Sequence, residues 1–184
     1  MNRSTSILLT VLALLSGCGG AASTGTVTTA ESTEVVASGV PAHLVIGGDS
    51  ANFGTHSLTT GFMPDPAIVD VVSGGNLDAS TANTGGVACA GWVTAQPDVI
   101  VNFDEMSGFL RFAFRPNTDG EDATLVINDG QGNWHCNDDA SGLNPVIDLA
   151  DAPPGQYDIW IGSYSASENI AGQLLITELS EVMP

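Results

Sequence analysis

The residues best suited to chemistry gather in one short stretch, GNWHCNDDASGLNP, at positions 132–145. It holds a histidine, a cysteine and two adjacent aspartates, Asp138 and Asp139, between glycine-rich turns. Carboxylate oxygens are the ligands that Ca²⁺ takes in proteins, and adjacent like charges repel unless they are solvated or share a cation. Two interpretations stay open for this pair: a Ca²⁺ site, and a structural corner in which each Asp accepts hydrogen bonds from loop N–H groups.

Other catalytic and metal-binding patterns are missing from the sequence. His43, His56 and His135 are scattered and no Cys-x-x-Cys pair occurs, which argues against zinc. The triplet GDS at positions 48–50 resembles the start of a hydrolase motif, but no histidine has an aspartate three residues before it. No nucleophile elbow, phosphate loop or dinucleotide fingerprint occurs. We therefore expect no enzymatic activity, with a hydrolase or hydrolase accessory module as a distant alternative.

Apart from Cys18 near the N-terminus, the sequence has two cysteines, Cys89 and Cys136. We expect them to form one disulfide, because the N-terminal residues described below predict export, and two cysteines in one exported domain pair most simply with each other. Trp92 and Trp134 lie close to them in sequence and are expected to pack over the bridge. Trp134 and Cys136 lie two positions apart, so both point to one face of a strand while His135 points to the other. This pattern gives His135 no reason to join the bridge or a ligand cluster.

The elements that position these residues are predicted to be strands. Short apolar runs occur at 98–103, 108–114, 123–128, 157–164 and 171–179, separated by turn sequences such as RPNTDGED and DAPPGQ. The run at 108–114 alternates apolar residues with period two, which indicates a strand with one buried face. Pro145 starts a further extended run, VIDL. Several short strands at this spacing predict a single all-β, antiparallel β-sandwich.

The N-terminus is typical of an export signal. A basic start is followed by the apolar run ILLTVLALL and then by LSGC, which resembles a bacterial lipobox. We therefore expect a signal peptide at 1–17 and lipidation of Cys18, the alternative being an ordinary cleaved signal. Gly19 follows, and this resemblance implies an exported protein anchored in the outer membrane, on its periplasmic or surface-exposed face. The small polar residues after Cys18 predict a flexible tether over 18–52, with the folded domain at 53–184. Within this range, AHLVIGGDS at 42–50 is either a first strand or more linker.

The charge balance restricts the partners. Arg3 leaves with the signal, so two arginines and no lysine face 21 acidic residues. Nucleic acid requires basic patches and is therefore excluded as a partner. Cations, basic proteins and neutral glycans stay open, and the acidity also fits simple solubility outside the cytoplasm.

The residue pattern over 124–164, TLVINDGQGNWHCNDDASGLNPVIDL followed by GQYDIWIGSY, resembles single-disulfide members of the bacterial pre-peptidase C-terminal (PPC) family. Upstream, GFMPDPAIVDVVSGGNLDA and CAGWVTAQPDVIVNF fit the same group. The resemblance implies a jelly-roll-like β-sandwich on a lipoprotein, and a non-catalytic binding or interaction module with a protein or glycan ligand. The alternative is a purely structural envelope domain without a discrete ligand.

Overall fold

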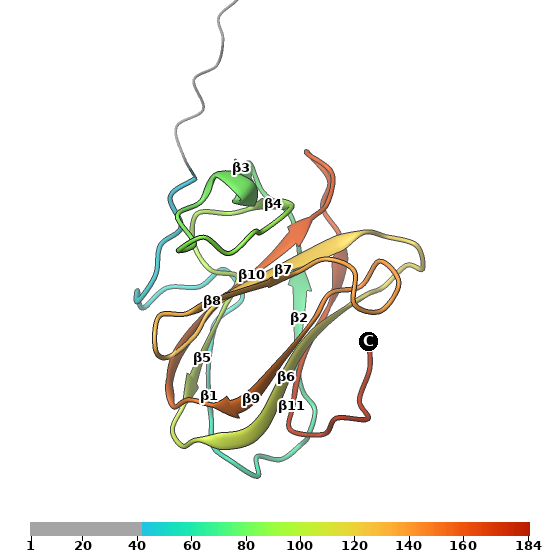
Figure 1. Cartoon of the computed structure of the whole chain (residues 1–184). Helices are drawn as coiled ribbons and strands as arrows, with labels where there is room; N and C mark the ends of the chain where they lie inside the picture. Colours follow the sequence, from blue (N-terminus) through green and yellow to red (C-terminus); the bar gives the residue numbers. More distant parts are fainter. Residues whose placement is uncertain (1–41) are drawn as a thin grey trace, which may run out of the picture. The chain divides into compact units, whose positions relative to one another are not determined.

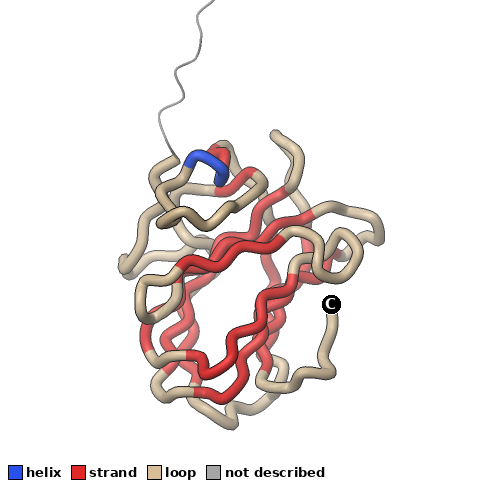
Figure 2. The backbone as a smooth tube through the Cα atoms, viewed as in Figure 1, coloured by secondary structure: helices blue, strands red, loops and turns tan. Residues whose placement is uncertain are grey.

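The structure, a computed structural model, describes residues 42–184, so the predicted signal peptide and Cys18 lie outside the described residues. The described part is built almost entirely of strands, with one 3-10 turn (Figure 2). The elements are β1 (Thr55–Leu58), β2 (Ala67–Val72), β3 (Leu77–Asp78), η1 (Ala79–Thr81), β4 (Trp92–Val93), β5 (Val99–Phe103), β6 (Ser107–Pro116), β7 (Ala123–Asn128), β8 (Trp134–Asn137), β9 (Val146–Ala152), β10 (Gly155–Ser163) and β11 (Ala171–Thr177).

The strands form two sheets that pack face to face (Figure 1). Sheet A has seven strands: β1, β5, β10, β4 and β3 follow one another, and β7 and β8 extend from β10. Sheet B has four strands in the order β2-β11-β6-β9. The predicted all-β sandwich is therefore confirmed.

The core between the sheets is explained by the alternation in the strands. In β6, Leu110, Phe112 and Phe114 are fully buried in the core, while Arg111 and Arg115 lie on the outer face of sheet B. Tyr157, Ile159 and Ile161 of β10 face them from sheet A. Residues i and i+2 of a strand point to the same face, so a period-two sequence supplies one side of this core.

One pair of strands differs from the antiparallel expectation. β1 runs parallel to β5, with Thr55 opposite Ile100 and Leu58 opposite Phe103. The preceding segment already runs beside the chain that enters β5, because Asn52 N–H donates to Pro97 O at 3.0 Å and Phe53 N–H donates to Asp98 O at 2.7 Å. The chain therefore reaches β1 in the same direction as β5, and sheet A is mixed.

A second, smaller cluster lies on the outer face of sheet A. Val126 and Trp160 point away from the main core and pack with residues of the two segments that cover them: Leu44, Ala79, Cys89 and Val93, with Leu77, Ala82, Trp134 and Cys136 at the margin. Leu44 belongs to the segment that was expected to be tether.

The folded domain therefore includes residues before the predicted boundary at 53. Ala42 and Leu44 are buried, and Val45 N–H donates to Ala95 O at 2.9 Å. Gly47 N–H donates to the buried carboxylate of Asp158 at 2.7 Å. The expectation of a tether that reaches residue 52 is wrong for 42–52, because their apolar side chains cover the outer face of sheet A.

Candidate functional site

Three connections between the sheets meet at one end of the sandwich. They are the β6–β7 loop (117–122), the β8–β9 loop (138–145) and the β10–β11 loop (164–170). Tyr164 N–H donates to Asp122 O at 2.9 Å, and Ala123 N–H donates to Leu143 O at 3.3 Å, so the three loops are joined at their bases. Loops held by a rigid scaffold are the usual carriers of binding residues.

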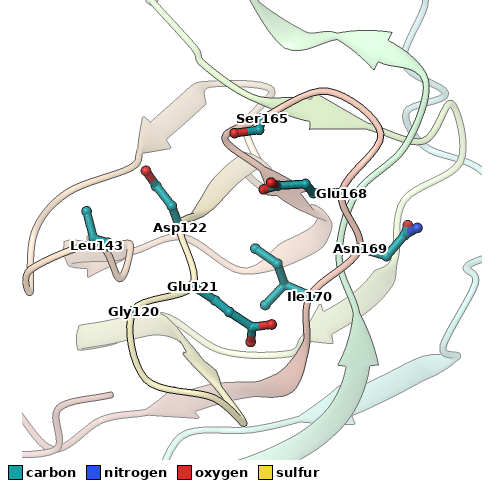
Figure 3. A pocket seen from close by; sticks show the side chains of 8 residues that line it. All are labelled: Gly120, Glu121, Asp122, Leu143, Ser165, Glu168, Asn169 and Ile170. Carbon is teal, nitrogen blue, oxygen red and sulfur yellow. The ribbon is translucent and has the colours of Figure 1, made fainter.

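These loops enclose a cavity of about 540 Å³, which we call the acidic cleft. Figure 3 shows Asp122 on the β6–β7 loop, opposite the β10–β11 loop that carries Ser165 and Glu168. Ile170, which is buried, and Leu143, which is exposed, add apolar surface. The cleft is lined by Gly120, Glu121, Asp122, Leu143, Ser165, Glu168, Asn169 and Ile170.

The electrostatics of the cleft centre on Asp122. Burial raises the pKa of its carboxyl, and the negative charges of Asp139, Asp138 and Glu168 raise it further. Its Oδ1 is buried and has no hydrogen-bond partner among residues 42–184. Several carboxylates around a shared space favour a cation, because opposite charge relieves their mutual repulsion.

The two aspartates singled out in the sequence lie beside this cleft but do not line it. Asp138 is half-buried and Asp139 is exposed. Neither side chain accepts a hydrogen bond from the described residues. The structure therefore does not show the expected hydrogen bonds from loop N–H groups to these aspartates. Ser141 and Asn144 pair through their own backbones at 3.0 and 3.1 Å, and Asn137 Oδ1 accepts from Val146 N–H at 3.0 Å.

The rest of the 132–145 stretch forms the expected corner. Cys136 is bonded to Cys89, with a Cα–Cα distance of 5.2 Å, so the predicted disulfide is confirmed. Trp134 packs against the same cluster as the disulfide, and its ring stacks on Trp160 at 5.8 Å between centroids. Trp160 belongs to this cluster, whereas Trp92, which was expected to pack over the bridge, does not.

A hydrogen-bonded histidine–aspartate pair lies at the β7–β8 hairpin, where the sequence predicted none. Asp129 is buried, and its Oδ2 lies 3.0 Å from His135 Nε2. Its Oδ1 accepts from the N–H groups of Gln131 and Asn133, both at 2.9 Å. Burial raises the pKa of Asp129, but the hydrogen bonds from His135, Asn133 and Gln131 outweigh it, so the pKa lies below its ordinary value.

The geometry of this pair fits a turn rather than a catalytic centre. Gly132 adopts a φ of 81° after a turn closed by its own N–H on Asp129 O, which is a conformation that suits glycine. In the described part of the chain, no Ser, Thr or Cys side chain is hydrogen-bonded to His135. The sequence could have indicated this pair, because Asp129 precedes a glycine-rich turn and His135 follows it, so a hairpin brings the two side chains close together.

Residues 42–184 contain neither a metal-binding cluster nor a membrane-spanning helix. No group of three or more His, Cys, Asp or Glu side chains is arranged to hold a metal ion there. No helix in that range is long and apolar enough to cross a bilayer. The Ca²⁺ site at Asp138 and Asp139 stays a prediction.

Comparison with solved structures gives several matching chains, one of which is described below. No protein-family model and no curated protein matches the chain. Among solved structures, the chain is similar to the pre-peptidase C-terminal domain of collagenase from Bacillus anthracis, with 12% sequence identity and a TM-score of 0.41. The match covers 67% of this chain and 94% of that one. Membership of the PPC family stays a prediction from the residue pattern.

Proposed function

We propose that this chain is an exported lipoprotein, anchored through Cys18, whose β-sandwich binds a basic side chain of a partner protein without catalysing a reaction. The observation that carries the proposal is the acidic cleft, where the carboxylates of Glu121, Asp122 and Glu168 share a cavity with the apolar side chains of Leu143 and Ile170.

The chemistry of the lining fits an arginine or lysine side chain. Both have an apolar stem and a cationic end, so they bury the stem on apolar surface and present the charge to polar groups. In the cleft, Leu143 and Ile170 provide the apolar surface and Glu168 and Asp122 provide the charge. Arginine suits the lining because its planar guanidinium can hydrogen-bond to carboxylates while its apolar stem packs on Leu143 and Ile170.

The charge of the whole chain supports the same class of partner. The exported part has 21 acidic residues against Arg111 and Arg115, and Arg111 is already paired with Asp148 at 2.6 Å. An acidic surface attracts basic partners and repels nucleic acid. The lipobox-like LSGC before the tether supports display at a membrane, in the outer membrane of a Gram-negative cell.

The test is calorimetric titration of the mature lipoprotein in detergent with two peptides of equal length. One carries a central arginine and the other carries citrulline, which has the same shape without the charge. We expect the arginine peptide to bind about tenfold or more tightly, the magnitude of one hydrogen bond to a charged group. Binding should weaken as salt is raised.

A matched pair of variants assigns the binding to the cleft. Glu168→Gln removes one charge from the lining, whereas Glu105→Gln removes one exposed charge from the β5–β6 turn, which is not part of the cleft. We expect only the first to weaken binding of the arginine peptide. Equal loss of binding in both variants would show that the peptide responds to the overall charge of the protein and not to the cleft. If neither peptide binds, the alternative of a purely structural envelope domain is favoured.

A further inference from the structure

The outer face of sheet B carries a row of apolar residues across all four strands. The register places Ile68 of β2, Leu175 of β11, Ala113 of β6 and Val146 of β9 side by side. The neighbours of Leu175 and Ala113 along their strands point into the core, so these two residues face outward. Leu175 is nevertheless only 2% exposed and Ala113 is 0% exposed. Groups from outside the row therefore cover its middle.

The segment that follows β11 lies over this face. Arg111 Nη1 donates to Ser180 O at 2.7 Å and to Val182 O at 2.8 Å, which brings these residues over β6. Pro184 lines a small cavity together with Arg115 at the far end of the same strand. In Figure 1 the chain turns after β11 and runs back beside sheet B. Residues 180–184, which we call the strap, thus lie along the outer face of β6.

One guanidinium fastens the strap. Arg111 is 7% exposed and binds Asp148 with both ends of its fork, at 2.6 Å from Nε and 2.7 Å from Nη2. The third nitrogen, Nη1, is left for the strap carbonyls and also lies 3.1 Å from Met183 Sδ. Among the described residues, Arg111 is the only side chain that donates hydrogen bonds to the strap backbone. The strap backbone donates one hydrogen bond to another backbone group, from Val182 N–H to Leu179 O at 3.2 Å, and this bond does not reach either sheet.

We infer that the strap is a conformational device: it opens as a unit when the Arg111–Asp148 pair is broken, and opening uncovers the apolar row on sheet B. Opening would make the covered middle of the row, Leu175 and Ala113, continuous with Ile68, which is already 49% exposed, and with Val72, which is 46% exposed. This face lies on the outer side of sheet B, and its residues do not line the acidic cleft. The inference therefore does not rest on the proposed function, although Pro184 at the end of the strap shares a cavity with Gly120, which also lines the cleft.

The test is hydrogen–deuterium exchange by mass spectrometry on the mature lipoprotein. Arg111→Met keeps an apolar stem but removes the donors, and Arg115→Met is the matched control on the same face of β6. In Arg111→Met we expect the amides of the segment after β11 to exchange about tenfold or more faster, since a hydrogen bond to a charged group is worth at least that factor. The core strands should exchange at the wild-type rate. Binding of a fluorescent apolar dye should rise in the same variant only.

Three outcomes would overturn the inference: unchanged exchange of the strap in Arg111→Met, equally faster exchange in Arg115→Met, or faster exchange of strap and core together. If Arg111→Met does not fold, Asp148→Asn replaces it. The Asp148 side chain is 45% exposed, so this change breaks the pair at the surface. Strap-specific exchange in Asp148→Asn would support the device, and wild-type exchange would refute it.

Discussion

Asp129 and His135 form a hydrogen-bonded pair across the β7–β8 hairpin, with 3.0 Å between Oδ2 and Nε2. Because Asp129 is buried and also accepts two backbone N–H groups, Asp129→Asn should destabilise the fold by about 2 kcal/mol. The pKa of Asp129 is lowered, so this contribution is present at neutral pH and is lost as pH falls below the ordinary value near 4. Urea unfolding at pH 7 and pH 3 measures both effects.

The control for this experiment is Asp104→Asn, which changes an exposed aspartate on the β5–β6 turn. It should leave the urea midpoint unchanged at both pH values. A wild-type midpoint for Asp129→Asn at pH 7 would contradict a stabilising role for the pair.

The contribution of Asp98 to the stability of the fold is expected to depend on pH in the opposite direction. It is 1% exposed, and burial raises its pKa to about 6, although hydrogen bonds from Asn52, Ile161 and Thr94 act against the rise. The folded state thus holds the proton more tightly than the unfolded chain. The contribution of Asp98 to stability should rise by about 1 kcal/mol from pH 7 to pH 5, and by on the order of 3 kcal/mol by pH 3.

The measurement is the free energy of unfolding across pH for wild type and for Asp98→Asn, taken as a difference so that other carboxylates cancel. Asn cannot titrate, so the difference should change through pH 6 and level off below the ordinary pKa of about 4. A flat difference would show that Asp98 titrates normally.

The disulfide should supply a large part of the stability. Cys89 and Cys136 are 47 residues apart, and loop closure at that length is worth about 4 kcal/mol in the chain-entropy model. Thiol titration of the unfolded, unreduced protein should find no free thiol among these two. Reductant should lower the urea midpoint of the wild type and leave a Cys89→Ala, Cys136→Ala double variant unaffected. Two titratable thiols would refute the bridge.

Much of the sandwich was predictable because its central strands alternate or are apolar throughout. The runs at 98–103, 123–128 and 171–179 correspond to β5, β7 and β11 within two residues at each end. β1 was missed since its sequence, THSL, carries no apolar alternation, and β3 and β4 are only two residues long. Residues 42–52 were assigned to the tether because their short apolar run has no partner in sequence, whereas the partner, Trp160, lies far along the chain.

The acidic cleft was not predictable for a related reason. Asp122, Leu143 and Glu168 come from three loops that are far apart in sequence. They meet because the chain passes between the two sheets three times at this end of the sandwich. In sequence each is an ordinary loop residue. Asp138 and Asp139 were conspicuous since they are adjacent, yet their influence on the site is electrostatic, through the pKa of Asp122.

The anchor predicted at Cys18 lies outside the described residues and is tested in cells. Cys18→Ser should move the protein from the membrane fraction to the soluble fraction, because lipidation at that residue is the expected source of membrane binding. Cys89→Ser together with Cys136→Ser is the matched control and should leave the protein in the membrane fraction. Retention of Cys18→Ser in the membrane would contradict the lipoprotein assignment.

The last prediction separates the two interpretations of Asp138 and Asp139. The β8–β9 loop is held by the backbone pair of Ser141 and Asn144 and by Asn137, which accepts from Val146 N–H. Without Ca²⁺, Asp138→Asn with Asp139→Asn should therefore melt at or slightly above the wild-type temperature, because the change removes two charges that repel Asp122. Asn137→Ala should melt lower, by the equivalent of about 1 kcal/mol, since it removes an acceptor from a backbone N–H.

Calcium then decides whether the pair also binds an ion. An ion that binds the folded state raises the melting temperature. A Ca²⁺-dependent rise in wild type and in Asn137→Ala, lost in the double variant, would establish the site at Asp138 and Asp139. A melting temperature that is the same with Ca²⁺ and with chelator in all three proteins would rule the site out, and the aspartates would then act only through their charge beside the acidic cleft. A double variant that melts lower than wild type in chelator would instead show that the aspartates support the loop directly.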